Sequence, residues 1–203
     1  MRSPGDMLYN FHWVVPGEIG RSAQAYAGFL APFLTRHGIR SVLNLRGPNP
    51  KFRWWHYEKR VCARLGVTHF DMPLNSRNLV LRLQLTRMLD FMDTAQAPLL
   101  VKCSGGQDRT SFACALHLLD RKGWRHFDDA MAQFGRWPYL HFPKAHQRWL
   151  KQFFVYGRGQ AGDKPLRRWI EDDYTPEDFK AWLDAHGMKD FYRTLYTAPP
   201  RGL

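Results

Sequence analysis

Residues 99–111 read LLVKCSGGQDRTS, and this stretch decides the fold. LLVK is a short apolar run typical of a buried strand, and the residues that follow Arg109 have the pattern of a helix. Between them, Gly105 and Gly106 allow the backbone to turn tightly and to direct its amides inward. Cys103 and Arg109 bracket five residues of this turn. The stretch therefore predicts a strand, a tight ligand-binding loop and a helix.

Strand-like and helix-like segments alternate before this stretch. We expect strands at Ile39–Leu45 and Val67–Phe70, and helices at Ser22–Gly38, Trp54–Gly66 and Leu81–Met92. This order predicts an α/β fold with a central, mostly parallel sheet flanked by helices. In open sheets of this kind the ligand lies beyond the carboxyl ends of the strands, which is where the Cys103 turn falls.

A glycine-rich stretch at residues 157–162 predicts a linker. It divides the chain into a domain over residues 1–156 and a C-terminal extension over residues 157–203. Within the extension, Thr175 and Pro176 are typical of the first positions of a helix. We therefore expect a short helical appendage after the main domain.

The chain has 203 residues and a formal net charge of +12. The first 156 residues carry 22 basic and 10 acidic side chains, whereas the extension carries 8 of each. The predicted domain therefore holds the whole positive excess. Such a field attracts phosphorylated substrates, and it equally fits a basic surface with weak affinity for nucleic acid or anionic lipid.

No apolar run approaches the roughly 18 residues of a membrane span, and the first residues lack the continuous apolar stretch of a secretory signal. Three cysteines cannot pair completely, which favours reduced thiols and a cytoplasmic protein. The nine histidines show no ligand spacing, so we expect no metal.

The predicted loop has the chemistry of a phosphate cradle. Inward amides and the start of a helix stabilise an anion, and they lower the pKa of Cys103. The planar guanidinium of Arg109 can bind two phosphate oxygens, and Thr110 can donate its hydroxyl to the sulfur. The phosphate-binding candidates are Ser104, Gly105, Gly106, Gln107, Asp108 and Arg109.

CSGGQDRT resembles the signature loop of the cysteine-dependent phosphatases of the protein-tyrosine and dual-specificity superfamily. The segments VVPGEIGRSAQ, GIRSVLNLRG and GVTHFDMPLNSR are similar in order to compact bacterial dual-specificity-like members. The resemblance covers about residues 8–155. It implies that Cys103 attacks phosphorus to form a cysteinyl-phosphate, that Arg109 and the loop amides hold the phosphate oxygens, and that no cofactor is needed.

The resemblance leaves the general acid open. The family usually has a histidine before the cysteine, where this chain has Lys102. Asp71 lies 32 residues before Cys103, as the usual acid does, but it precedes Pro73 whereas that acid follows the corresponding proline. Asp108 matches the aspartate inside the loops of myotubularin-like and Sac-type phosphatases. We favour Asp108 over Asp71.

The implied substrates are phosphotyrosine or phosphoserine proteins, or highly anionic phosphoesters such as phosphoinositides, inositol phosphates or RNA 5′ ends. Nucleic acid in general is a possible partner but is not favoured. One alternative is a catalytically inactive phosphate-binding module, and another is a rhodanese-like sulfurtransferase. Some relatives protect the nucleophile with a disulfide, which makes Cys62 a candidate partner of Cys103.

Overall fold

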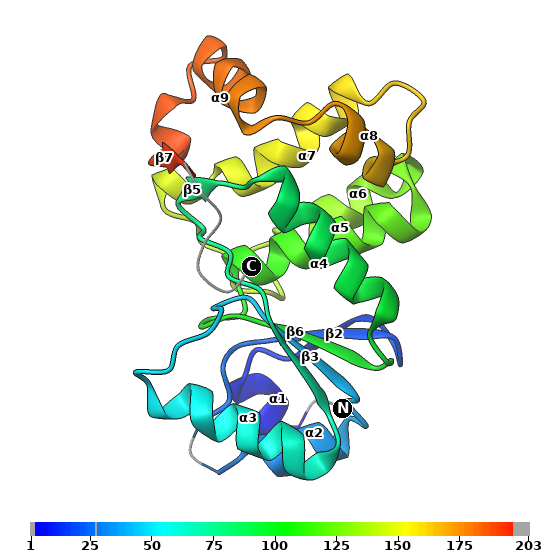
Figure 1. The fold of residues 1–203 in the computed structure, drawn as a ribbon, viewed down its shortest axis with the longest axis vertical. Coiled ribbons are helices and arrows are strands. Elements are labelled where there is room, and N and C mark those ends of the chain that lie inside the picture. Colours follow the sequence, from blue (N-terminus) through cyan, green and yellow to red (C-terminus); the bar gives the residue numbers. More distant parts are fainter. Residues whose placement is uncertain (1–2, 27, 197–203) are drawn as a thin grey trace.

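The structure is a computed structural model that describes residues 3–26 and 28–196. Its centre is a five-stranded sheet in the order β1-β2-β6-β3-β4 (Figure 1). β1 pairs antiparallel with β2, and the other neighbours are parallel. The strands are β1 (His12–Val15), β2 (Ile19–Ser22), β3 (Ser41–Asn44), β4 (Thr68–Asp71) and β6 (Leu99–Lys102). The predicted α/β fold with a mostly parallel sheet is confirmed.

Helices cover both faces of the sheet (Figure 1). One face carries α1 (Pro4–Leu8), α2 (Leu30–Arg36) and α3 (Arg53–Leu65). The other carries α4 (Arg82–Thr94), α5 (Asp108–Lys122) and α6 (Phe127–Ala132), with α7 (Trp149–Gln160), α8 (Leu166–Asp172) and α9 (Pro176–Ala185) beyond them. Short 3₁₀ turns span Trp124–His126, Ala145–Gln147 and Lys189–Phe191. None of the helices in the described ranges is both long and apolar enough to cross a bilayer.

The alternation of side chains along β6 divides the interior into two cores. Val101 and Cys103 belong to the core that α4 and α5 cover. Leu100 belongs to the core under α2 and α3, together with Cys62. The two cysteines therefore lie on opposite faces of the sheet.

The prediction of a helix over Ser22–Gly38 is wrong in its first half, and β1 and β2 were not anticipated. The amide of Ala23 donates to the carbonyl of Tyr9 (2.7 Å), and the amide of Gln24 donates to that of Ser104 (3.1 Å). These amides are engaged in tertiary contacts and are not available to a helix, so α2 covers only the second half of the range.

The predicted linker at residues 157–162 is also wrong, because α7 continues to Gln160. Gly157 is required by packing rather than by flexibility. A Cβ there would lie 2.9 Å from Trp169 and 3.0 Å from Trp124. The glycine thus lets two tryptophans pack against the helix, and the chain after it continues the fold.

The helical extension itself is confirmed. α9 begins after Thr175, whose hydroxyl accepts a hydrogen bond from the amide of Asp178 (3.0 Å). Phe179 and Leu183 of α9 are fully buried in the same core as Cys103. The extension therefore packs onto the domain.

Candidate active site

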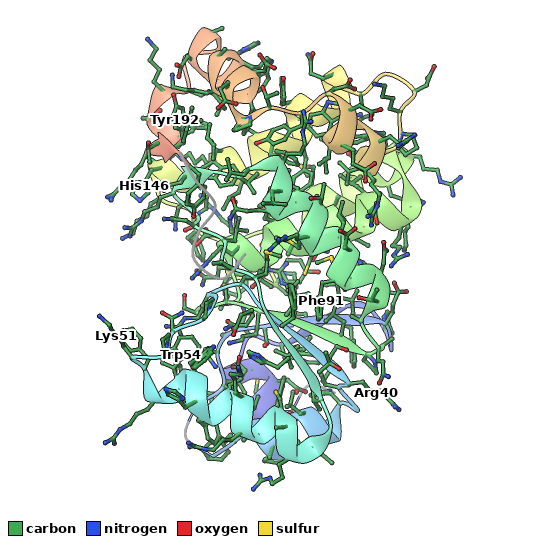
Figure 2. All side chains as sticks on the ribbon, in the orientation of Figure 1. Arg40, Lys51, Trp54, Phe91, His146 and Tyr192 are labelled. Carbon is green, nitrogen blue, oxygen red and sulfur yellow. The ribbon has the colours of Figure 1, made fainter. Side chains whose placement is uncertain are left out.

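The Cys103 loop follows β6, the central strand, at the carboxyl edge of the sheet. Figure 2 shows Trp54 and His146 at this side of the molecule and Arg40, which precedes β3, at the opposite side. A pocket of about 490 Å³ opens at this edge. Its lining comes from the loop, from the segments after β3 and β4, from the 3₁₀ turn before α7, and from the C-terminal extension: Arg46, Pro73, Leu74, Asn75, Ser76, Arg77, Ser104, Asp108, Arg109, Gln147 and Tyr196.

The loop amides turn inward because the carbonyls of the loop are held from outside. Three consecutive carbonyls accept hydrogen bonds: Ser104 from the Gln24 amide (3.1 Å), Gly105 from the Asn10 side chain (3.4 Å) and Gly106 from Arg21 (3.0 Å). A peptide group whose oxygen is fixed outward presents the next amide to the interior of the loop. The loop is therefore shaped before any ligand binds.

Arg21 is the principal support of the loop, and it is fully buried. Its other hydrogen bonds go to Ser111 (2.8 Å) and to the backbone and side chain of Gln133 (2.9 and 3.0 Å), and its guanidinium lies 4.0 Å over the ring of Tyr139. Arg21 was not among the site residues expected from the sequence. No local pattern marks it, because Arg21 stands between Gly20 and Ser22 and its acceptors are at least 85 residues away in sequence.

Gly106 is the position at which the loop requires a glycine. Its φ is +64°, in the left-handed region. A Cβ there would lie 2.6 Å from the amide nitrogen of Ala23 and 2.8 Å from the carbonyl oxygen of Ser22. Only glycine meets both the conformation and the close approach of β2.

The Cys103 thiol is buried, and burial by itself raises the pKa of a thiol. The positive charge of Arg109 opposes that effect, and so do hydrogen bonds from Thr110 and from the backbone amide of Gln107. Together these donors hold the pKa of Cys103 below its usual 9.0. The Thr110 hydroxyl oxygen is buried and makes no other hydrogen bond of good geometry in the described residues. The loop thus favours the thiolate, which is the nucleophilic form.

Arg109 is held at the rim of the loop. Its guanidinium donates to the carbonyl of Leu45 (3.3 Å) and to the hydroxyl of Ser104 (3.0 Å), and it lines the pocket. Two hydrogen bonds thus fix the guanidinium group of Arg109, and the group also borders the pocket. That arrangement suits two oxygens of a phosphate.

The two candidate acids differ in position. Asp108 lines the pocket, and its Oδ2 accepts a hydrogen bond from the side chain of Gln147 (3.2 Å). Asp71 lies at the end of β4, and both of its oxygens are occupied, by Asn44 (2.6 Å) and by the indole of Trp55 (2.9 Å). Asp71 is not among the residues that line the pocket. Of the two candidate acids, Asp108 is therefore the one that lies at the pocket.

Lys102 does not act on the loop. Its side chain points to the opposite face of the sheet, where it is buried and pairs with Glu58 (2.6 Å) and Gln24 (2.8 Å). His69 completes this cluster with a contact of 2.8 Å to Glu58. The lysine therefore contributes to a buried charge network on the face of the sheet opposite Cys103.

The three cysteines are free thiols. Burial raises the pKa of Cys62 to about 12 and that of Cys114 to about 11. Cys62 lies across the sheet from Cys103. The placement therefore disfavours the disulfide that the resemblance suggested.

The extension contributes one wall of the pocket. A short parallel ribbon joins β5 (Asn78–Leu79) to β7 (Thr194–Leu195), and the amide of Arg193 donates to the carbonyl of Arg77 (2.7 Å). This pairing places Tyr196 in the pocket lining, where burial raises the pKa of its phenol. Nothing in the sequence pattern pointed to Tyr196.

Unpaired cations surround the pocket. Arg46, Arg77 and Arg109 line it, and none of them pairs with a carboxylate of the described residues. Arg46 instead donates to Gln24 (3.2 Å) and lies 3.6 Å over the ring of Trp54. No three His, Cys, Asp or Glu side chains gather as metal ligands anywhere in the described ranges.

The sequence matches no protein-family model and no curated protein. Solved structures do match. TpbA of P. aeruginosa is similar with 19% identity, a TM-score of 0.58, and coverage of 85% of this chain and 95% of that chain. PTPMT1 in complex with PI(5)P is similar with 13% identity, a TM-score of 0.57, and coverage of 74% and 98%.

A mutant form of Tk-PTP is similar with 14% identity, a TM-score of 0.58, and coverage of 74% of this chain and 97% of that chain. A TpbA variant in complex with phosphotyrosine matches as well. The architecture expected from CSGGQDRT is thus confirmed by the likeness of whole folds. This chain has the fold of TpbA, PTPMT1 and Tk-PTP.

Proposed function

We propose that this protein is a phosphatase that hydrolyses phosphate monoesters through a cysteinyl-phosphate. The observation that carries the proposal is the placement of the buried Cys103 thiol, which faces Arg109 and receives hydrogen bonds from Thr110 and from the amide of Gln107. A thiolate at that point attacks phosphorus, while Arg109 and the amides stabilise the charge on the other phosphate oxygens. Asp108 supplies a proton to the leaving oxygen.

The charge around the pocket favours a highly anionic substrate. Arg46, Arg77 and Arg109 have no carboxylate partner in the described structure, and His146 lies near Arg77, Lys144 and Arg193. A cation without a carboxylate partner gives up no existing ion pair when it binds a phosphate, whereas a paired cation does. Phosphoinositides, inositol phosphates and RNA 5′ ends fit this field better than a phosphoserine or phosphotyrosine protein with a single phosphate.

Hydrolysis of para-nitrophenyl phosphate by the wild type, with Cys103→Ser as control, tests the activity. Phosphate release that disappears in Cys103→Ser supports the proposal. Phosphate binding without turnover would instead indicate a phosphate-binding module, and thiosulfate-to-cyanide transfer would indicate a sulfurtransferase. A screen of inositol phosphates, phosphoinositides, 5′-phosphorylated RNA and phosphopeptides then tests the substrate class.

A further inference from the structure

One buried polar contact beside the pocket has no role in the chemistry described so far. Nε2 of His141 lies 3.2 Å from Oδ1 of Asp108. Both atoms are buried, and neither has a hydrogen-bond partner of good geometry in the described residues. The separation is that of an ion pair, although the angles are not those of a hydrogen bond. A small rotation of the carboxyl group would align them.

The other nitrogen of the ring fixes where the protons are. Nδ1 of His141 lies 3.1 Å from the carbonyl oxygen of Phe134, and a carbonyl only accepts. Nδ1 therefore carries hydrogen. A neutral ring would then turn the lone pair of Nε2 toward a carboxylate oxygen of Asp108, and two buried acceptors at 3.2 Å repel each other. One proton held between Nε2 and Oδ1 removes this repulsion.

The second oxygen of the carboxyl group is held as well. Gln147 donates to Oδ2 of Asp108 (3.2 Å) and to the hydroxyl of Ser76 (3.0 Å). His141 and Gln147 belong to the segment between α6 and α7, so one segment fixes both ends of the carboxyl group. The side chain of Asp108 keeps an exposed fraction of 21% and lines the pocket.

The groups around the pair are mainly cations. On the histidine side they are Arg136, Arg148 and Lys151, which line a second pocket of about 330 Å³ with His141. On the aspartate side they are Arg46, Arg77 and Arg109, together with the Cys103 thiol. A pair that shares one proton has no net charge in either arrangement, as imidazolium with carboxylate or as imidazole with carboxylic acid. Loss of that proton would leave the pair with a charge of −1, which the surrounding cations favour, so the buried contact between Nε2 and Oδ1 has to retain the proton against them.

We propose that His141 is a positioning residue whose Nε2 holds one proton against Oδ1 of Asp108, so that the pair can deliver that proton through Asp108 to the leaving oxygen. This inference rests on the proposed phosphatase activity. In the first step the Cys103 sulfur forms a bond to phosphorus, the ester P–O bond breaks, and the leaving oxygen takes the proton of the pair. In the second step water attacks phosphorus, the P–S bond breaks to restore the thiolate, and one proton of the water reloads the pair.

A series of phosphate esters tests the proposal through the leaving group. In His141→Gln we expect hydrolysis of phenyl phosphate to fall about 100-fold, because phenolate needs a proton as it leaves. Hydrolysis of para-nitrophenyl phosphate should change less than about fivefold, since that leaving group is stable without one. Asp108→Asn should show the same split. The double variant should be no slower than Asp108→Asn, since the two residues act as one unit.

His117→Gln is the matched control. His117 is equally buried, pairs with Glu18 (2.9 Å), and lies on α5 outside the pocket lining. Replacement of His117 should leave the ratio of the hydrolysis rates of phenyl phosphate and para-nitrophenyl phosphate as in the wild type. The rate of Cys103 alkylation checks in each variant that the loop remains intact.

The ring nitrogens of His141 give a readout that needs no variant of the histidine. In ¹⁵N spectra of the labelled full chain, we expect the Nε2 resonance of His141 to shift in Asp108→Asn while that of His117 stays in place. Equal slowing of both esters in His141→Gln, no slowing of either, or an unmoved resonance would overturn the role of His141. A wild type without Cys103-dependent hydrolysis would instead refute the proposed function.

Discussion

Cys62 and Cys103 are both buried thiols, and they lie on opposite faces of the same sheet. Burial raises the pKa of Cys62 to about 12, whereas the pKa of Cys103 is held below 9.0 although that thiol is buried as well. The difference lies in what surrounds the sulfur. Cys62 has Glu58 in its vicinity, while Cys103 faces Arg109 and inward amides. The difference in pKa between the two buried thiols therefore follows from the charges and donors around each sulfur and not from exposure.

The two faces of the sheet also differ in whether their cations are paired with carboxylates. On the Cys62 side, Lys102 and Glu58 neutralise each other in a closed cluster. On the Cys103 side, the cations at the pocket have no carboxylate partner in the described residues. The closed cluster stabilises the sheet, and the open one leaves positive charge for a ligand.

The largest expected difference between the faces is in alkylation. At pH 7 a thiol with a pKa of about 12 is ionised to a fraction of about 10⁻⁵, so Cys62 should stay unlabelled by iodoacetamide while Cys103 reacts. The alkylation rate of Cys103 should reach half of its maximum below pH 9. Peptide mass mapping measures both. Unfolded protein is the control, in which all three cysteines react alike, and faster labelling of Cys62 in the native state would contradict the comparison.

The next largest effect, a loss of unfolding free energy, is expected from the buried Glu58–Lys102 pair on the Cys62 side of the sheet. Glu58→Gln leaves Lys102 without its counter-charge, which we expect to cost about 3–5 kcal/mol of unfolding free energy at pH 7. Burial opposes ionisation of Glu58, yet His69 and Lys102 outweigh it and hold the pKa of Glu58 below its usual 4.5. The contribution is therefore complete above pH 4.5 and is lost as the pH falls through the lowered value.

Urea unfolding at pH 7 and at pH 4 measures this difference. The gap between wild type and Glu58→Gln should narrow at the lower pH. Glu177→Gln is the matched control, because Glu177 is exposed on α9. A cost at pH 7 that is no greater than that of the control would mean that Lys102 is not held by its partner.

On the Cys103 side of the sheet, two substitutions of Arg109 separate the effect of its positive charge from the effect of its planar guanidinium group. Arg109→Met and Arg109→Lys should both lower kcat/KM for para-nitrophenyl phosphate by about 10²–10³-fold, because neither can bind two phosphate oxygens in parallel. Only Arg109→Met should also raise the pKa of Cys103, since lysine keeps the positive charge. The pH dependence of alkylation measures that shift. An equal shift in both variants would contradict a role for charge.

The sequence predicted the parts of this molecule that local pattern encodes. The β6 strand, the loop with its glycines and the helix from Asp108 follow from apolar periodicity and turn chemistry. The two predictions that were wrong concern segments whose structure depends on contacts with residues distant in sequence. The amides of Ala23 and Gln24 bond to Tyr9 and Ser104 instead of forming a helix, and Gly157 packs against tryptophans instead of ending a domain.

The same division holds for the site. Cys103, Arg109 and Asp108 lie in one contiguous motif, so their types and spacing suffice to nominate them. Arg21, His141 and Tyr196 reach the loop from strands and segments far along the chain. No spacing rule links such residues to Cys103, and only the tertiary fold brings them together.

The smallest expected effect compares two neighbouring glycines of the loop. Gly106→Ala introduces a Cβ at φ +64° against the backbone of Ser22 and Ala23, whereas a Cβ at Gly105 would meet only the Gln107 side chain at 3.5 Å or more. We expect backbone strain in Gly106→Ala to lower the unfolding free energy by about 1–3 kcal/mol. Turnover should slow about tenfold or more, because the loop amides would no longer point to the interior of the loop.

Gly105→Ala, the matched control, should stay near wild type in both stability and kcat. Thermal unfolding and para-nitrophenyl phosphate hydrolysis measure the two effects together. If Gly106→Ala kept full activity, the close packing of the loop on β2 would not be what orients its amides. The contrast between the faces would then rest on Arg109 alone, because the remaining donors to Cys103 depend on that same backbone path.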